Sequence, residues 1–213
     1  MKIAGIDEAG KGPVIGPLIV CGVCLDQNLV SVLKKLGVKD SKKLSPKRRA
    51  FLADKIKEIS EFHIVKIDPP RLDELMASKT INDIILDACI EIINRLNPNI
   101  VYVDCPHVNI SKFKAILEKC TRKKIIADHK ADSKYEIVSA ASILAKVTRD
   151  CEIDKIKKEI AEDFGSGYPS DVRTINFLKR IINEGKDLPW FVRKSWKTTS
   201  SLFQRDLSSF LNE

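Results

Sequence analysis

The sequence has no hydrophobic run long enough to cross a membrane. Its longest uncharged apolar stretch, residues 14–25, is broken by two glycines and a proline and falls short of the roughly 18 residues that a spanning helix needs. An apolar stretch behind a basic start, which marks a secretory signal, is also missing because Asp7 and Glu8 arrive almost at once. We therefore expect a cytoplasmic protein that has no membrane partner.

Several catalytic signatures are missing as well. The three histidines lack zinc-ligand spacing, and the sequence contains no Gly-x-Ser-x-Gly motif, P-loop or dinucleotide fingerprint. These absences disfavour nucleophile-based hydrolases and nucleotide-cofactor enzymes.

Cysteine is too sparse to suggest a disulfide framework in a chain of this size. The six cysteines lie mostly in apolar segments, which predicts reduced core residues. Cys21 and Cys24 have the spacing of half a zinc site, but no second pair follows and strand residues alternate between faces. Core packing is the better interpretation of this pair.

The remaining composition is that of a globular, basic protein. With 213 residues, 44% of them hydrophobic and 31% charged, the chain can build a core and is not broadly disordered. The formal net charge is +8, and the basic excess is concentrated in the first fifty residues. This asymmetry suggests a face for nucleic acid, although a solvated lysine-rich surface would give the same count.

Short β-rich runs alternate with helical segments after an initial hairpin. Residues 3–6 and 14–24 predict two strands around the turn formed by Gly10, Lys11 and Gly12. The later alternation implies parallel pairing with helices covering the sheet, which is an α/β architecture. The later strands are expected at residues 64–67, 100–103 and 124–127.

Helix-capping signals divide the rest of the chain. Ser45 followed by proline predicts a helix over residues 46–60, and Thr80 with Asp83 is a capping-box variant that begins an amphipathic helix. Residues 135–163 read as helical, and shorter helices are expected after Gly165. We expect a sheet domain over residues 1–163 and a small α-helical extension over residues 164–213.

Acidic residues occur where strands end. Asp7 and Glu8 follow one buried-looking strand, Asp104 ends another, and Asp132 lies at the start of a helix. Each acid alone would be read as a strand-end or cap residue. If they converge at the carboxyl edge of the sheet, their repulsion calls for hard cations such as Mg²⁺ or Mn²⁺, which are suited to hydrolysing phosphodiesters.

Five motifs in the right order give the chain a specific resemblance to ribonuclease HII, especially its archaeal branch. They are Gly-Ile-Asp-Glu-Ala-Gly-Lys-Gly-Pro at 5–13, Val-Lys-Asp-Ser-Lys-Lys-Leu at 38–44, Tyr-Val-Asp at 102–104, His-Lys-Ala-Asp at 129–132 and Gly-Ser-Gly-Tyr-Pro-Ser-Asp at 165–171. The resemblance covers nearly the whole chain. It implies a ribonuclease H-like mixed sheet flanked by helices, followed by a small helical domain.

The resemblance also implies catalytic roles. Asp7, Glu8, Asp104 and Asp132 match the family's four metal-binding acids, which hold the divalent ions that activate water. Asp128 is the nearest rival for the fourth place, but it precedes the His-Lys-Ala-Asp motif instead of ending it.

Substrate-reading residues are implied in the same way. Gly10, Lys11 and Gly12 match a Gly-Arg-Gly loop whose backbone contacts the ribose 2′-hydroxyl, and Tyr168 matches a tyrosine that packs on the sugar. Lys11 lacks the planar fork of arginine, which puts a bidentate phosphate contact in question. Without the resemblance, Tyr168 would be read as a half-buried residue in a glycine-rich turn.

Two lysines are expected to contact the nucleic-acid backbone. Lys42 lies in a basic run that otherwise reads as a solvated helix end, and Lys146 matches a family lysine near the active site.

We expect a monomeric endonuclease that cuts on the 5′ side of a ribonucleotide in RNA–DNA hybrids or junctions. The alternative is a catalytically silent protein that binds RNA–DNA hybrids.

The C-terminal segment resembles the peptide by which replication enzymes dock on the PCNA sliding clamp. Gln204, Leu207 and Phe210 follow at three-residue intervals, and Leu211 replaces the commoner second aromatic residue. The alternative is that these apolar side chains pack the last turn against the helical domain.

Overall fold

A computed structural model describes residues 1–38 and 44–202, and its residues cluster into two compact units. The first, called here the sheet unit, comprises Met1–Ala9, Ile19–Lys66 and Thr80–Thr148. The second, the helical unit, comprises Gly10–Leu18, Ile67–Lys79 and the chain from Arg149 onward. This division differs from the expected single boundary after residue 163, because two early segments join the C-terminal part of the chain.

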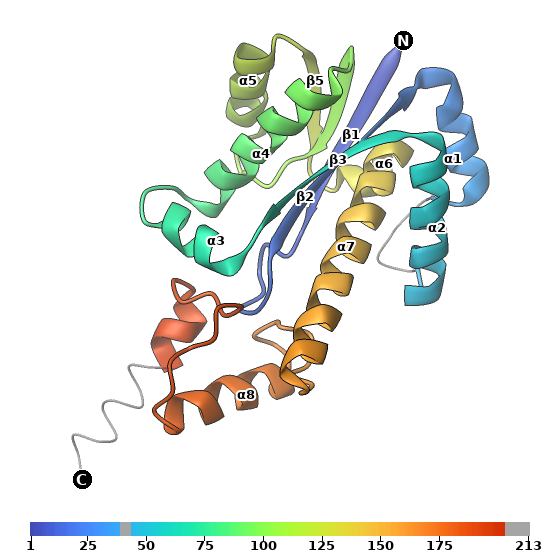
Figure 1. The fold of residues 1–213 in the computed structure, drawn as a ribbon. Coiled ribbons are helices and arrows are strands. Elements are labelled where there is room, and N and C mark those ends of the chain that lie inside the picture. Colours follow the sequence, from blue (N-terminus) through green and yellow to red (C-terminus); the bar gives the residue numbers. More distant parts are fainter. Residues whose placement is uncertain (39–43, 203–213) are drawn as a thin grey trace. The chain divides into compact units, whose positions relative to one another are not determined.

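The sheet unit is built on a mixed sheet in the strand order β3-β2-β1-β4-β5 (Figure 1). Strand β1 is antiparallel to β2 and parallel to β4, which is in turn parallel to β5. The expected parallel pairing is therefore confirmed for these later strands. The strands are β1 (Lys2–Ala9), β2 (Leu18–Asp26), β3 (Glu61–Ile67), β4 (Ile100–Asp104) and β5 (Lys124–Asp128).

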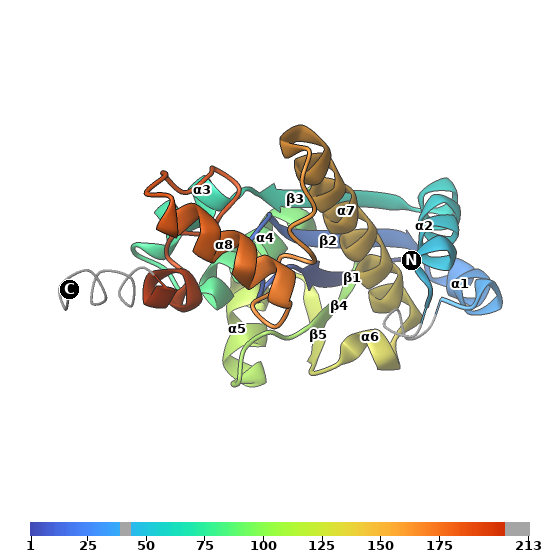
Figure 2. The same ribbon diagram turned by 90° about the horizontal axis from the view of Figure 1, so that it is seen from below.

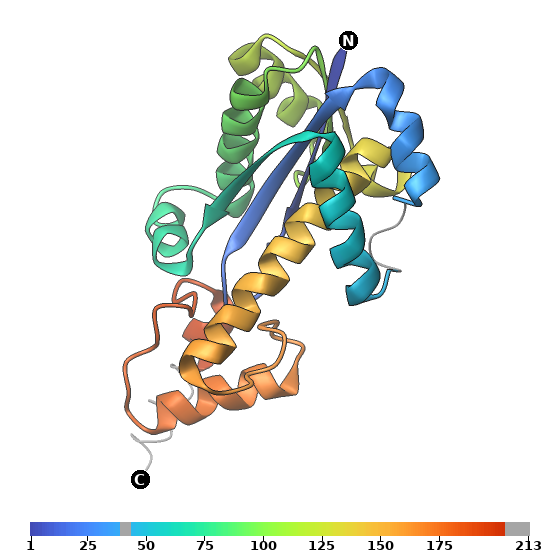
Figure 3. The ribbon, with the colours of Figure 1, turned by 45° about the vertical axis from the view of Figure 1, so that its right-hand side comes forward.

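Helices cover both faces of this sheet, as Figures 2 and 3 show. One face carries α1, α2 and the first part of α7, and the other carries α4 and α5. The helices of the unit are α1 (Val30–Leu36), α2 (Pro46–Ile59), α4 (Ile81–Leu96), α5 (Ile110–Thr121), α6 (Ala131–Lys134) and α7 (Glu136–Ile160), with a short 3₁₀ turn η1 (Gln27–Leu29). Helix α7 runs from the sheet unit into the helical unit.

Two glycines let helices approach the sheet closely. A Cβ at Gly5 would lie 2.2 Å from the Ile137 carbonyl oxygen, and one at Gly22 would lie 2.2 Å from Ile92 Cγ2. The α7 backbone therefore packs directly on β1, and α4 packs on the opposite face at β2.

Both capping predictions are confirmed. The Ser45 hydroxyl accepts from the Arg48 backbone N–H at 3.3 Å, and Pro46 is the first residue of α2. Thr80 and Asp83 form a reciprocal capping box at the start of α4.

The predicted second strand is wrong over its first residues. Residues 14–17 belong to the connection between β1 and β2, within which Ile15 forms an isolated bridge with Val192. Pro17 has no N–H to donate, and Gly16 has a φ of +87°, so this stretch cannot continue a regular ladder. The Gly10–Gly12 segment is thus part of a long connection and is not a tight hairpin turn.

The cysteine prediction is confirmed in part. All six cysteines are free, and Cys21, Cys24, Cys89 and Cys105 are buried. Cys120 and Cys151 are exposed, because they lie beside the buried stripes of α5 and α7 and not within them.

The helical unit has its own core. It contains α3 (Pro69–Met76), α8 (Val172–Asn183) and the second part of α7. The rings of Phe164 and Phe177 lie 5.6 Å apart, and those of Phe164 and Phe191 lie 5.9 Å apart. Val14 and Ile15 of the β1–β2 connection belong to the same core. Among residues 1–38 and 44–202, no helix is long and apolar enough to cross a membrane.

Candidate active site

Strand register brings two of the predicted acids to neighbouring positions. Ile6 of β1 is paired with Val103 of β4, and Asp7 and Asp104 follow directly on these parallel strands. Glu8 continues β1 beyond Asp7. The sheet unit therefore gathers carboxylates at the carboxyl edge of its central strands, where open α/β sheets bind ligands.

Asp7 is the most deeply buried of these strand-end acids. Its side chain is 6% exposed, and its Oδ1 accepts from the Glu8 backbone N–H at 2.8 Å. Burial, followed by the charges of Glu8 and Asp104, raises the pKa of Asp7 well above its usual range, against the opposing effect of a hydrogen bond with Ser142. The carboxylates at this edge of the sheet therefore repel one another, and a bound cation would reduce that repulsion.

Asp132 lies next to a residue that contacts Asp104. The Ala131 backbone N–H donates to Asp104 Oδ1 at 3.0 Å, which places the start of α6 against the end of β4. Asp132 is the second residue of this short helix and is 3% exposed. The local fold thus carries the fourth predicted acid to the same part of the sheet unit.

Asp128, the rival for the fourth position, is engaged elsewhere. Its Oδ1 accepts from Lys134 Nζ at 2.8 Å, and its Oδ2 accepts from the Tyr135 hydroxyl at 2.7 Å. The hydrogen bond from Lys134, and to a smaller extent that from Tyr135, lowers the pKa of Asp128. Both oxygens are used within its own turn, which favours Asp132 as the fourth acid.

The donor set fits a hard divalent cation. All four predicted ligands are carboxylates, the oxygen donors preferred by Mg²⁺ and Mn²⁺. Over residues 1–38 and 44–202, however, no three Asp, Glu, His or Cys side chains are already gathered as a complete metal-ligand group. Mutual repulsion disfavours the close approach of several carboxylates that have no neutralising charge between them.

The predicted sugar-reading residues belong to the helical unit. Gly10 has a φ of +91°, and a Cβ there would lie 2.6 Å from the Pro17 carbonyl oxygen. At Gly12 the nearest atom to an added Cβ is Tyr168 Cε1, at 3.9 Å. Lys11 lies between the two glycines and is half-buried. The structure therefore brings the glycine loop and Tyr168 together.

Of the residues predicted to contact phosphates or a sliding clamp, the structure describes only Lys146. Lys146 is a half-buried residue of α7 in the sheet unit, one helical turn after Ser142. Lys42 lies outside the described residues, as do the clamp-binding candidates Gln204, Leu207, Phe210 and Leu211.

Three side chains around these sites were not predicted. Ser142, which bonds to Asp7, could have been found from its spacing of one helical turn before Lys146. Arg149 and Arg193 are buried beside the glycine loop. Nothing in the sequence marks them, because arginine in a helix or turn ordinarily indicates a solvated surface.

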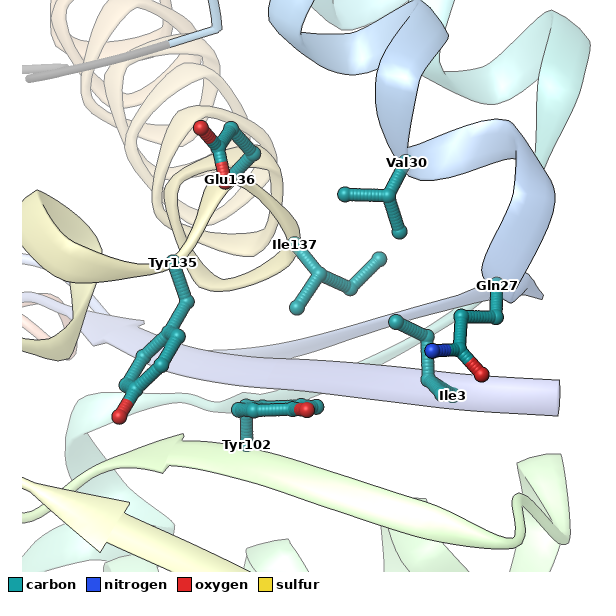
Figure 4. A pocket seen from close by; sticks show the side chains of 7 residues that line it. All are labelled: Ile3, Gln27, Val30, Tyr102, Tyr135, Glu136 and Ile137. Carbon is teal, nitrogen blue, oxygen red and sulfur yellow. The ribbon is translucent and has the colours of Figure 1, made fainter.

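A pocket of about 260 Å³ in the sheet unit lies apart from the predicted site residues (Figure 4). Tyr102 and Tyr135 form one wall with ring centroids 4.8 Å apart, and none of the predicted site residues lines it. This pocket therefore does not mark the carboxylate edge.

Comparisons with known proteins agree with the motifs and the fold. The family model for ribonuclease HII matches residues 4–199. A curated ribonuclease HII from Archaeoglobus fulgidus is 52% identical over 208 residues, which span 97% of this chain and 99% of the relative.

Solved structures give the same result. The PCNA:RNase HII complex from Archaeoglobus fulgidus matches with a TM-score of 0.88 and 51% identity, covering 92% of this chain and 96% of that one. Ribonuclease H2 from Pyrococcus horikoshii OT3 matches with a TM-score of 0.90 and 40% identity, covering 96% and 98%. The sheet order and flanking helices confirm the expected ribonuclease H-like fold, and the chain belongs to the ribonuclease HII family.

Proposed function

We propose that this ribonuclease hydrolyses the phosphodiester on the 5′ side of a ribonucleotide embedded in, or joined to, duplex DNA. Asp7, Glu8, Asp104 and Asp132 hold the divalent cation that the reaction requires. When bound, the cation supplies a water of lowered pKa and positive charge for the scissile phosphate. The products are a 3′-hydroxyl and a 5′-phosphate.

The burial of the Asp7 carboxyl beside Glu8 and Asp104 is the observation that carries this proposal. A carboxyl that is buried beside Glu8 and Asp104 is destabilised in its charged form unless positive charge joins it. A purely structural role would be met better by a neutral side chain, because burying like charges costs stability. Perturbed carboxyls at a strand edge are typical of functional sites.

Neighbouring groups hold two of the acids in orientation. The Glu8 backbone N–H and Ser142 bond to Asp7, and the Ala131 N–H bonds to Asp104. These contacts restrict the carboxylate rotamers before substrate binds, so less ordering remains to be done during catalysis.

Recognition of the sugar falls to the helical unit. The backbone of Gly10, Lys11 and Gly12 reads the 2′-hydroxyl, and Tyr168 packs on the neighbouring sugar. The space above Gly12 supports this role, because it lets main-chain atoms approach a ribose closely. Lys42 and Lys146 are proposed to contact backbone phosphates, so sequence preference should be weak.

The proposed cofactor is Mg²⁺ or Mn²⁺, since both take carboxylate and water ligands. All four acids come from one chain, so we propose that a monomer is active.

The Archaeoglobus fulgidus relative is found in a complex with PCNA. By analogy, we propose that Gln204, Leu207, Phe210 and Leu211 dock this chain on a PCNA-type clamp.

A nicking assay tests the enzyme against the alternative, a silent hybrid-binding protein. A duplex with one ribonucleotide is incubated with protein and Mg²⁺, and a matched all-DNA duplex is the control. The proposal predicts a nick in the first duplex only, stopped by a chelator. Tight binding without any metal-dependent nick would support the silent protein.

A further inference from the structure

Two arginines of the helical unit are almost completely buried. Arg149 is 2% exposed and Arg193 is 0% exposed. Among the described residues, Arg149 Nε and Arg193 Nη1 have no hydrogen-bond partner, and the ion pair of Arg149 with Asp150 spans 4.0 Å. Burying two guanidinium groups, each with one nitrogen that lacks a hydrogen-bond partner, costs free energy, so stability alone does not explain the pair.

Arg193 joins Gly10, the first residue of the Gly10–Gly12 loop, to Gly16 further along the same β1–β2 connection. Its Nη2 donates to the Gly10 carbonyl at 2.7 Å and its Nε donates to the Gly16 carbonyl at 2.9 Å. Its own backbone N–H donates to the Val14 carbonyl at 2.9 Å, and its guanidinium lies 4.6 Å from the Trp196 ring centroid. Burial, and then the charge of Arg149, lowers the pKa of Arg193 to about 9.

Arg149 lies between the glycine loop and Tyr168. Its guanidinium carbon is 4.9 Å from the Tyr168 ring centroid, and its Nη2 donates to the Ser166 carbonyl at 3.1 Å. A Cβ at Gly10 would lie 3.0 Å from Arg149 Cδ, and one at Gly167 would lie 3.3 Å from Nη2. The same side chain therefore contacts both elements to which sugar recognition is assigned.

We propose that Arg149 and Arg193 are positioning residues that fix the spacing between the Gly10–Gly12 backbone and the Tyr168 ring, and so set how well a ribonucleotide is recognised. The inference rests on the proposed function of the loop and Tyr168. Arginine suits the task because its planar fork can stack on an aromatic ring while its edge donates to carbonyls. A lysine at either position keeps the charge but cannot do both.

The test is a double-mutant cycle between Arg149 and Tyr168. Cleavage of the single-ribonucleotide duplex is measured for wild type, Arg149→Met, Tyr168→Ala and the double variant. Arg149→Met should lower kcat/KM by roughly ten- to a hundredfold, since a misplacement of about 1 Å can cost that much. The Mg²⁺ concentration for half-maximal activity should not change, because the acids lie in the sheet unit.

In the Tyr168→Ala background, Arg149→Met should lower kcat/KM by less than about threefold, because the ring that Arg149 positions is already absent. Arg149→Lys and Arg193→Lys, which keep the charge, should also lose activity while melting close to wild type. Arg180→Met is the matched control: Arg180 is an exposed helical-unit arginine paired with Glu162, and its loss should leave cleavage unchanged.

Fully additive losses for Arg149 and Tyr168 would overturn the proposal, since they indicate independent effects. Unfolding of both Arg149→Met and Arg149→Lys would also overturn it, by assigning the arginine to stability. Wild-type protein that produces no metal-dependent nick would instead refute the proposed function itself.

Discussion

Asp7 and Asp104 occupy the positions that directly follow Ile6 and Val103, the last paired residues of the parallel strands β1 and β4. Strand pairing, and not a flexible loop, therefore sets how close the two carboxyls lie. Their repulsion contributes to the raised pKa of Asp7. A neutral substitution at either position should relieve that repulsion and leave the sheet intact.

Asp7→Asn should abolish cleavage and raise the melting temperature in the presence of a chelator. Below the ordinary carboxyl pKa of about 3.9 the group is protonated in both the folded and unfolded chain. Above it the unfolded chain ionises first, so Asp7 lowers folding stability as pH rises towards its raised native pKa. Asparagine removes that penalty at neutral pH, whereas kcat should fall by more than about a hundredfold.

Glu58→Gln provides the control for this change, because Glu58 is an exposed α2 residue paired with Lys55. It should alter neither cleavage nor the melting temperature. Wild-type rates for Asp7→Asn under saturating Mg²⁺ would show that the carboxylate assignment is wrong.

Alanine at the two glycines of the loop should have opposite consequences. Gly10→Ala adds a Cβ 2.6 Å from the Pro17 carbonyl at a positive φ, so it should destabilise the protein by about 1–3 kcal/mol. Gly12→Ala meets nothing closer than 3.9 Å and should change stability by less than about 0.5 kcal/mol. Denaturant unfolding measures both.

Although its stability should be normal, Gly12→Ala should lose cleavage, because the new methyl group would occupy the space that the proposed contact with the ribose requires. Full activity of a folded Gly12→Ala protein would contradict the assignment of sugar reading to this backbone.

Tyr168→Ala should reduce junction cleavage more than it reduces duplex binding, since the ring is assigned to the sugar and not to the phosphate backbone. Tyr168→Phe keeps the ring that lies over Arg149 and should retain most activity. Cleavage rates and fluorescence anisotropy on the same duplex separate the two effects. Equal losses of binding and cleavage in Tyr168→Ala would indicate a folding role instead.

Deleting residues 204–213 should abolish co-elution with a PCNA-type clamp while nicking of a short duplex continues at the wild-type rate. Phe210→Ala should reproduce the loss of clamp binding, and Ser209→Ala is the neighbouring control. The tether would be refuted by a truncated chain that still binds the clamp, or by one that no longer folds.

Local signals in the sequence predict much of this fold. The capping box at Thr80 and the Ser45–Pro46 helix start are encoded within a few residues, and the structure confirms both. The first strand is likewise expected from its local apolar run, although it continues past Asp7 to Ala9. These features depend on neighbours in the chain, which is why the sequence alone reveals them.

Tertiary contacts account for what the sequence could not predict. Val14 and Ile15 look like strand residues but pack in the core of the helical unit with Phe164 and Phe191. Arg193 reaches Gly10 across 183 positions of the chain. Neither contact has a periodic or compositional signature, so the buried arginines and the early segments of the helical unit could be found only in three dimensions.

The most direct test of the central claim is to map the cut and its end groups at nucleotide resolution in a duplex with one ribonucleotide. The account predicts a single metal-dependent nick on the 5′ side of the ribonucleotide, with a 3′-hydroxyl and a 5′-phosphate, because water is the nucleophile. A chelator-resistant cut on the 3′ side that leaves a 2′,3′-cyclic phosphate would contradict it, since the ribose hydroxyl and not water would then have attacked.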